Sequence, residues 1–121
     1  MEKTYITLTG LKYYEIAESL KVGMQLICIK DLDNKYDQDA IVVVTKGLYR
    51  VGYVANSPYT VAKGTKSASR IYDTLKQGVY VEVKFIIKDS VICEILDKDI
   101  EDGIFSNIED IKARIFEDYY D

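Results

Sequence analysis

The stretch Asp31-Leu-Asp-Asn-Lys-Tyr-Asp-Gln-Asp-Ala-Ile-Val-Val-Val44 joins a polar loop to an apolar strand. In residues 31–39, Asn and Asp side chains can bond to nearby backbone groups and so form defined turns. Residues 40–44 are an unbroken apolar run rich in β-branched residues, which is typical of a buried strand. An ordered polar loop attached to a buried strand is a common position for function. The same residues can also serve only as a stable turn.

Strand patterns recur on both sides of this stretch. Five further segments alternate between apolar and polar residues or are apolar throughout, and they are Lys3–Thr9, Met24–Lys30, Leu48–Val54, Val79–Ile87 and Val91–Leu96. Within the segment from Val79, the residues expected to face the core are Val79, Val81, Val83, Phe85 and Ile87. Gly52 lies inside a strand pattern and indicates a bulge or a close approach to the backbone.

The insertion between the fourth and fifth strands contains helix signals. Ser57 and Pro58 suit the N-cap and first position of a short helix that Gly64 can end. Apolar residues then recur at helical spacing between Ala68 and Leu75, before Gly78. Six strands in 96 residues with one helical insertion predict a mainly β fold, a small six-stranded antiparallel barrel.

The charged residues are unevenly distributed along the chain. The net charge is −4, with +2 on residues 1–96 and −6 on residues 97–121. We therefore expect a barrel domain over residues 1–96, then an acidic linker and an amphipathic C-terminal helix within residues 97–121. Ser106 and Glu109 form a capping box for that helix, and its apolar stripe consists of Ile108, Ile111 and Ile115.

Composition disfavours catalysis and metal binding. The chain has no histidine, which excludes Ser-His-Asp and Cys-His catalysis and His-ligated metals. The acidic loop has Tyr36 and Val42 where a calcium loop needs glycine and glutamate. We therefore expect no enzyme activity, no metal and no cofactor. A metal-dependent nuclease is a third hypothesis that rests on the acidic loop alone.

The cysteines and the hydropathy pattern bear on the cellular setting. Cys28 and Cys93 lie within apolar strand patterns and are expected to be reduced core residues. No apolar run is long enough to span a bilayer, and the N-terminus has no signal-peptide pattern. The expected location is the cytoplasm, with no membrane partner.

Three blocks of the sequence resemble the HIRAN domain. They are Gly10-Leu-Lys-Tyr-Tyr14, Asn34-Lys-Tyr-Asp-Gln-Asp-Ala-Ile41, and Val51-Gly-Tyr-Val54 followed by Ser57-Pro58. The resemblance covers roughly residues 4–96. This module is found in some fork-remodelling helicases and as a small stand-alone bacterial protein. The resemblance implies an OB-like barrel with a pocket for the 3′ end of single-stranded DNA.

The resemblance also implies roles for individual residues. Lys12 would contact a phosphate, while Tyr13 and Tyr36 would stack on or flank the terminal bases. Asn34 and Asp37 would hydrogen-bond to the terminal nucleotide, with Asp37 accepting a bond from the free 3′-hydroxyl. Single-stranded DNA recognition by cations and stacked rings has the same physical basis.

Other positions of the motif are less direct contacts or depart from the family pattern. Tyr14 is expected to pack inward, and Tyr53 and Asn56 fall where the helicase version has further DNA contacts. The family usually has Pro where this chain has Lys35, Asn where it has Asp39, and a basic residue where it has Asn56. The helicase version also has an aromatic residue on a later loop, for which no secure equivalent is found.

These departures support a second hypothesis from another class. The chain would then be a protein-interaction or regulatory module with weak or no DNA binding. Its acidic helix around Ile108, Ile111 and Ile115 would dock a protein partner, pair two copies, or fold over Lys12 and Tyr13 in place of DNA. A simpler alternative is that this helix packs its apolar stripe on the barrel.

Overall fold

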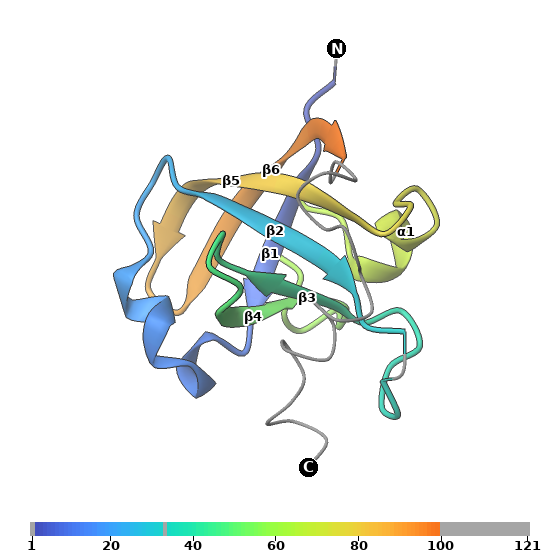
Figure 1. The fold of residues 1–121 in the computed structure, drawn as a ribbon, viewed down its shortest axis with the longest axis horizontal. Coiled ribbons are helices and arrows are strands. Elements are labelled where there is room, and N and C mark those ends of the chain that lie inside the picture. The colour runs from blue at the N-terminus through green and yellow to red at the C-terminus, as the bar shows by residue number, and fades with distance from the viewer. Residues whose placement is uncertain (1, 33, 100–121) are drawn as a thin grey trace.

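Six antiparallel strands close into a barrel in the computed structural model, which describes residues 2–32 and 34–99 (Figure 1). The strand order around the barrel is β1-β4-β3-β2-β5-β6. The strands are β1 (Tyr5–Thr9), β2 (Gln25–Lys30), β3 (Ile41–Val44), β4 (Arg50–Val54), β5 (Gly78–Ile87) and β6 (Ser90–Asp99). The predicted six-stranded antiparallel barrel is confirmed. Closure leaves no open sheet edge, which otherwise favours aggregation.

The barrel interior is filled by alternate side chains of the strands. Cys28 of β2 pairs with Val43 of β3 on one side and with Val79 of β5 on the other. All three side chains are buried in one core cluster. Both cysteines are buried free thiols that form no disulfide, as their apolar strand patterns predict.

A β-bulge interrupts the alternation in β4. The register with β3 shifts between Val43 and Val44, and Val51 is the extra residue of β4. The neighbouring Gly52 lies against β1, because a Cβ atom there would be 2.5 Å from the carbonyl oxygen of Thr9. The sequence predicted a bulge or a close approach at Gly52, and the structure has a bulge beside it and a close approach of another backbone segment.

The first part of the insertion contains turns, not the expected helix. The carbonyl of Ser57 accepts the N–H of Val61, which closes one turn, but no helix forms before Gly64. The chain is held to β1 instead, because the Thr7 hydroxyl accepts the N–H of Ala62 at 3.1 Å. The prediction of a helix between Ser57 and Gly64 was wrong because this bond to a distant strand replaces helix continuation.

The second part of the insertion is the predicted short helix. α1 (Ala68–Tyr72) buries Ala68 and Ile71 in the barrel core. The helix ends earlier than the apolar spacing suggests. Leu75 lies beyond its end, where the Leu75 N–H donates to the carbonyl of Tyr72. Gly78 already begins β5.

The far end of the β5–β6 hairpin is exposed to solvent. Phe85 and Ile87 are 54% and 58% exposed, so the prediction that they face the core was wrong. The β5–β6 register shifts between Val83 and Phe85, and the strand continues beyond the part of the barrel that encloses the core. At its other end β6 reaches Asp99, three residues past the predicted strand end at Leu96.

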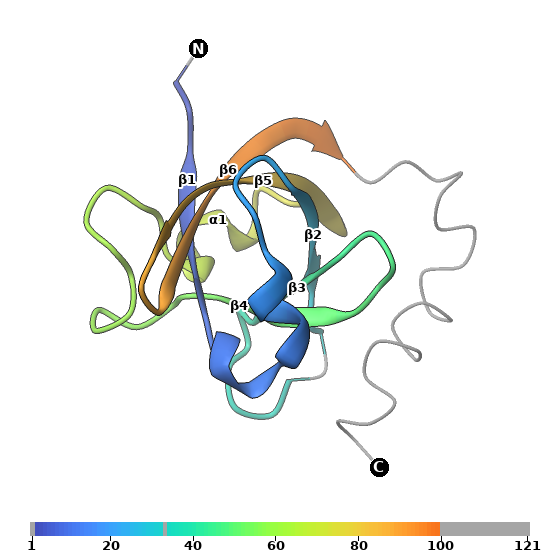
Figure 2. The same ribbon diagram turned by 90° about the vertical axis from the view of Figure 1, so that its left-hand side faces the viewer.

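Two connections flank β2 at its opposite ends; they lie at the lower left and lower right of Figure 1 and in the lower half of Figure 2. One is the segment between β1 and β2, with the short 3-10 helices η1 (Leu11–Tyr13) and η2 (Glu15–Ser19). The other is the loop between β2 and β3.

The C-terminal helix predicted from Ser106 lies outside the described residues. Within residues 2–32 and 34–99, no helix is long and apolar enough to cross a membrane.

Candidate nucleic-acid interface

Asn34 organises the loop between β2 and β3. Its side-chain oxygen accepts the backbone N–H groups of Tyr36 and Asp37 at 2.8 and 2.9 Å. Its amide group donates to Oδ2 of Asp31 at 2.9 Å. Asn and Asp side chains commonly order turns through bonds of this kind. The loop therefore presents Tyr36, which is 88% exposed, on an ordered backbone.

Asp37 and Asn56 are brought together from separate parts of the chain. The Asn56 side-chain amide donates to Oδ2 of Asp37 at 3.1 Å, and Oδ1 of Asp37 accepts the N–H of Asp39 at 2.9 Å. The Asn56 oxygen accepts the N–H of Ser69 in the first turn of α1 at 2.8 Å. Asn56, which follows β4, thus links the polar loop to the helix. A carboxylate has about four lone-pair sites, so these two bonds leave Asp37 able to accept more.

Asp31 is a buried carboxylate beneath this loop. It is 1% exposed, and its Oδ2 also accepts the hydroxyl of Tyr53 at 3.2 Å. Tyr53 therefore connects β4 to the start of the loop. Asp31 begins the polar stretch from which the sequence analysis starts, but no role was predicted for it. The available signal was its position directly after a buried strand, but its burial depends on partners 3 and 22 residues away.

The segment Lys12-Tyr13-Tyr14 leaves β1 at a left-handed turn. Gly10 has φ of +75°, a conformation that glycine adopts without the Cβ clash of other residues. Lys12 and Tyr13 are exposed, and Nζ of Lys12 is 5.3 Å from the Tyr13 ring centroid. Tyr14 is only partly exposed, and the Arg50 guanidinium lies 5.4 Å from its ring centroid. Tyr14 is thus less exposed than Tyr13, and its inward packing stays a prediction.

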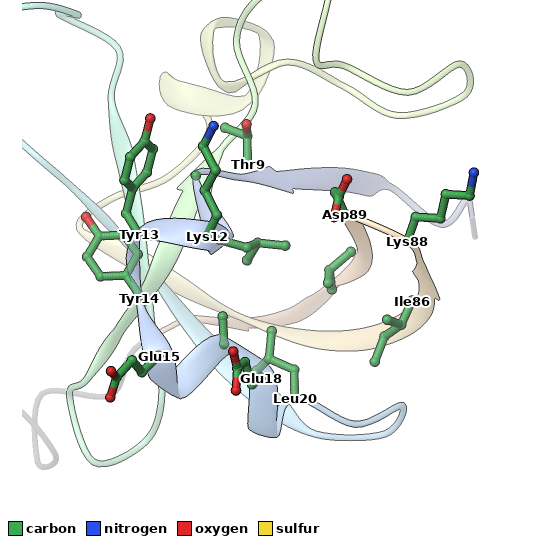
Figure 3. A pocket seen from close by; sticks show the side chains of 14 residues that line it. Thr9, Lys12, Tyr13, Tyr14, Glu15, Glu18, Leu20, Ile86, Lys88 and Asp89 are labelled. Atoms are coloured by element: carbon green, nitrogen blue, oxygen red, sulfur yellow. The ribbon is translucent and has the colours of Figure 1, made fainter.

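A groove of about 800 Å³ runs beside this segment. One wall is formed by η1 and η2, and the other by the end of the β5–β6 hairpin. Figure 3 shows Lys12 and Tyr13 projecting to the same side of η1, with Ile86, Lys88 and Asp89 across the groove. Apolar side chains such as Leu20 lie at its base, and charged ones stand at its rim. Sequence reasoning did not identify the hairpin end as a wall of this groove.

β4 connects the two groups of candidate residues. Tyr53 pairs with Thr9 at the end of β1, and Arg50 contacts the Tyr14 ring. Asn56, just beyond β4, bonds to Asp37. The first group therefore contacts the start of β4 at Arg50, and the second lies beyond its end at Asn56.

The described residues contain no group of three or more histidine, cysteine, aspartate or glutamate side chains arranged to hold a metal ion. Asp31, Asp37 and Asp39 instead bond to protein donors. Oδ2 of Asp39, for example, accepts the Ser69 hydroxyl at 2.8 Å. These carboxylates order the loop through hydrogen bonds, and the arrangement suits recognition of a polar group by fixed donors and acceptors.

The chain is similar to known proteins in sequence and in fold. A family model described as HIRAN domain matches residues 1–88. The crystal structure of the HIRAN domain of human HLTF has a TM-score of 0.56 and 18% identity, covering 93% of this chain and 88% of that chain. A crystal structure of a protein from Lactobacillus plantarum has a TM-score of 0.55 and 24% identity, covering 76% of this chain and 88% of that chain. At these identities the two structures support the fold alone. Among curated proteins, none matches the chain.

Proposed function

The chain belongs to the HIRAN domain family, a family of DNA-binding modules, and we propose that it recognises single-stranded DNA that ends in a free 3′-hydroxyl. A HIRAN domain is not catalytic by itself, so the proposal concerns a binding module. The barrel domain over residues 1–96 would carry the binding site. The cytoplasmic location expected from the sequence stays a prediction.

One observation carries the proposal, namely the ordered loop that presents Tyr36 beside Asp37. Asn34 fixes the backbone of both residues through its side-chain oxygen. Asn56 holds one carboxylate oxygen of Asp37. A site ordered before the ligand arrives loses less entropy on binding. Asp37 then accepts the 3′-hydroxyl with its remaining lone pairs, while Asn34, with one amide hydrogen left, donates to the terminal nucleotide.

The exposed rings and lysine supply the rest of the interaction. Tyr36 and Tyr13 are 88% and 74% exposed, so bases can stack on both. Stacking contributes about 1–3 kcal/mol per base, and two rings therefore give about 2–6 kcal/mol of the roughly 8 kcal/mol that a micromolar Kd requires. Lys12, beside Tyr13, is placed to contact a phosphate. A site that contacts an end needs few phosphates and accommodates a small net charge.

The test is fluorescence anisotropy with a short labelled single strand at low salt. We expect a 3′-phosphate to weaken binding at least about fivefold, because its added negative charge near Asp37 costs about 1 kcal/mol or more. Tyr13→Ala and Tyr36→Ala should each weaken binding about 5- to 100-fold. Tyr59→Ala is the matched control, since Tyr59 is a 97% exposed tyrosine outside the proposed site. Equal affinity for both ends would refute 3′-end recognition.

A protein-interaction module is the second candidate function. Consecutive apolar side chains are exposed at the end of the β5–β6 hairpin, namely Phe85, Ile86 and Ile87. Contiguous exposed apolar groups often mark a protein contact. Failure of the full chain to bind either DNA end would favour this function. The double substitution Phe85→Ser and Ile87→Ser should then abolish binding of the partner protein.

A further inference from the structure

The barrel has a second apolar cluster on its outer face, opposite the core. Ile29 of β2 pairs with Val42 of β3, and Ile27 pairs with Val44 and with Tyr80 of β5. These positions alternate with the core residues of the same strands, so their side chains point out of the barrel. Yet all five are only 0–4% exposed. Side chains on the outside of a sheet reach such values only when other atoms lie over them.

The described elements do not provide that cover. The apolar side chains that pack against the outer cluster are Leu48, Tyr53 and Leu96, which belong to the same barrel wall or its turn. Helix α1 packs into the core through Ala68 and Ile71. The 3-10 helices η1 and η2 pack mainly on β4. Among residues 2–32 and 34–99, none of the helices α1, η1 and η2 therefore packs extensively on β2 or β3.

The chain continues from β6 beside this cluster. Asp99 at the end of β6 pairs with Val79, the neighbour of Tyr80, and Leu96 already contacts the cluster. Residues 100–121 follow, which extended could span up to about 70 Å and so easily cross the face. Their apolar stripe of Ile108, Ile111 and Ile115 matches the apolar surface. Residues 97–121 carry a charge of −6, and Arg50 stands at the edge of the face, opposite Val44.

We propose that residues 100–121 cover the outer face of β2, β3 and β5, with Ile108, Ile111 and Ile115 packed on the cluster. The cover then acts on the candidate DNA site through Tyr53, in a step that rests on the proposed function. Tyr53 packs against the outer cluster, and its hydroxyl bonds to Asp31. Asp31 in turn accepts a hydrogen bond from the Asn34 side-chain amide, and the Asn34 oxygen fixes the backbone of Tyr36. The segment is a positioning element for the binding loop.

The direct test measures proximity in the unmodified full chain. Nuclear Overhauser effects between isoleucine and valine methyl groups should connect Ile108, Ile111 or Ile115 with Val42 and Val44. A mixed sample, in which one population of chains carries labelled isoleucine and the other labelled valine, reports contacts between copies. We expect the cross-peaks in the doubly labelled sample and none in the mixed sample. Their absence from both, or their presence in the mixed sample, would overturn the proposal.

A variant in the full chain tests the consequence for the loop. The triple substitution Ile108→Ser, Ile111→Ser and Ile115→Ser should weaken single-stranded DNA binding about three- to tenfold. It should also expose the methyl groups of Val42 and Val44 to a soluble paramagnetic agent. The control Tyr59→Ser changes a 97% exposed residue outside the proposed site and should change neither. Unchanged protection of those methyl groups would refute the cover. If the wild-type chain binds no DNA, the proposed function fails, whereas the methyl contacts still decide the cover.

Discussion

Replacing Gly52 with alanine tests the junction between β1 and β4, from which the Lys12-Tyr13-Tyr14 segment starts. The added Cβ would lie 2.5 Å from the carbonyl oxygen of Thr9 and 3.2 Å from Cδ2 of Leu11. Ordinary contact begins at 3.4 Å, so the two backbone segments must separate by about 0.9 Å. Thr9 belongs to a barrel strand, and backbone of this kind cannot move as a flexible side chain can.

The magnitude follows from this displacement. A hydrogen bond of about 2.9 Å that lengthens by about 0.9 Å falls outside the useful range, and each lost bond costs about 1 kcal/mol net. Overpacking of a close contact costs a further 1–3 kcal/mol or so. We therefore expect Gly52→Ala to lower the free energy of unfolding by about 2–4 kcal/mol. That change corresponds to a fall in Tm of roughly 10 °C or more for a domain of this size.

The assay is urea unfolding followed by circular dichroism. Gly47→Ala serves as the control, because Gly47 lies in an exposed turn, has no positive φ, and leaves a Cβ 3.4 Å from the Tyr49 ring. The control should change stability by less than about 1 kcal/mol in either direction. A stability of Gly52→Ala within about 0.5 kcal/mol of wild type would refute the close-approach argument.

Four further substitutions test the loop charge, the contrast between a buried and an exposed residue of β5, and a buried thiol. Asp39→Asn keeps an acceptor for Ser69 but removes a negative charge near the proposed site. Single-stranded DNA affinity at low salt should therefore rise about two- to fivefold, and the gain should shrink in high salt. A loss of affinity in the anisotropy assay would contradict this expectation. Val83→Ala should lower the free energy of unfolding by about 2 kcal/mol because Val83 is fully buried. Phe85→Ala should lower it by under about 1 kcal/mol in the same urea assay, because Phe85 is exposed. Equal losses for the two variants would contradict the exposure of Phe85. Burial raises the pKa of the Cys93 thiol from 9.0 to about 12. Between pH 9 and 12 the unfolded chain therefore loses this proton while the folded chain keeps it. The contribution of the thiol to the free energy of unfolding is complete below pH 9 and is lost as the pH rises toward 12. Urea unfolding as a function of pH should show a smaller alkaline loss for Cys93→Ala than for wild type, and parallel curves would rule out this contribution.

Local patterns in the sequence predicted most of the barrel. Strand alternation and β-branched runs located all six strands, and the spacing of Ala68 and Ile71 located α1. Gly52 indicated a bulge or a close approach, and the structure contains both. These features depend on neighbours in the sequence, since the two-residue period of a strand and the conformational freedom of glycine act over a few residues.

The candidate site was predicted less completely. The family motif located Tyr13, Tyr36 and Asp37, but their roles in binding remain proposals. The buried Asp31 beneath the loop was not identified, because its burial and its bond to Tyr53 need residues 22 positions apart. The hairpin wall of the groove was missed for the same reason, as Lys12 and Lys88 are distant in sequence.

The sequence by itself determined where the strands lie and which loop carries the polar residues, because short-range periodicity and turn chemistry are local properties. Only the tertiary structure decided which apolar residues are covered. Phe85 continues the inward pattern of its strand but is exposed, since the hairpin extends beyond the enclosed core. Val42 points outward but is fully buried. Burial depends on what lies over a side chain, and in a closed barrel those atoms come from segments far away in the chain.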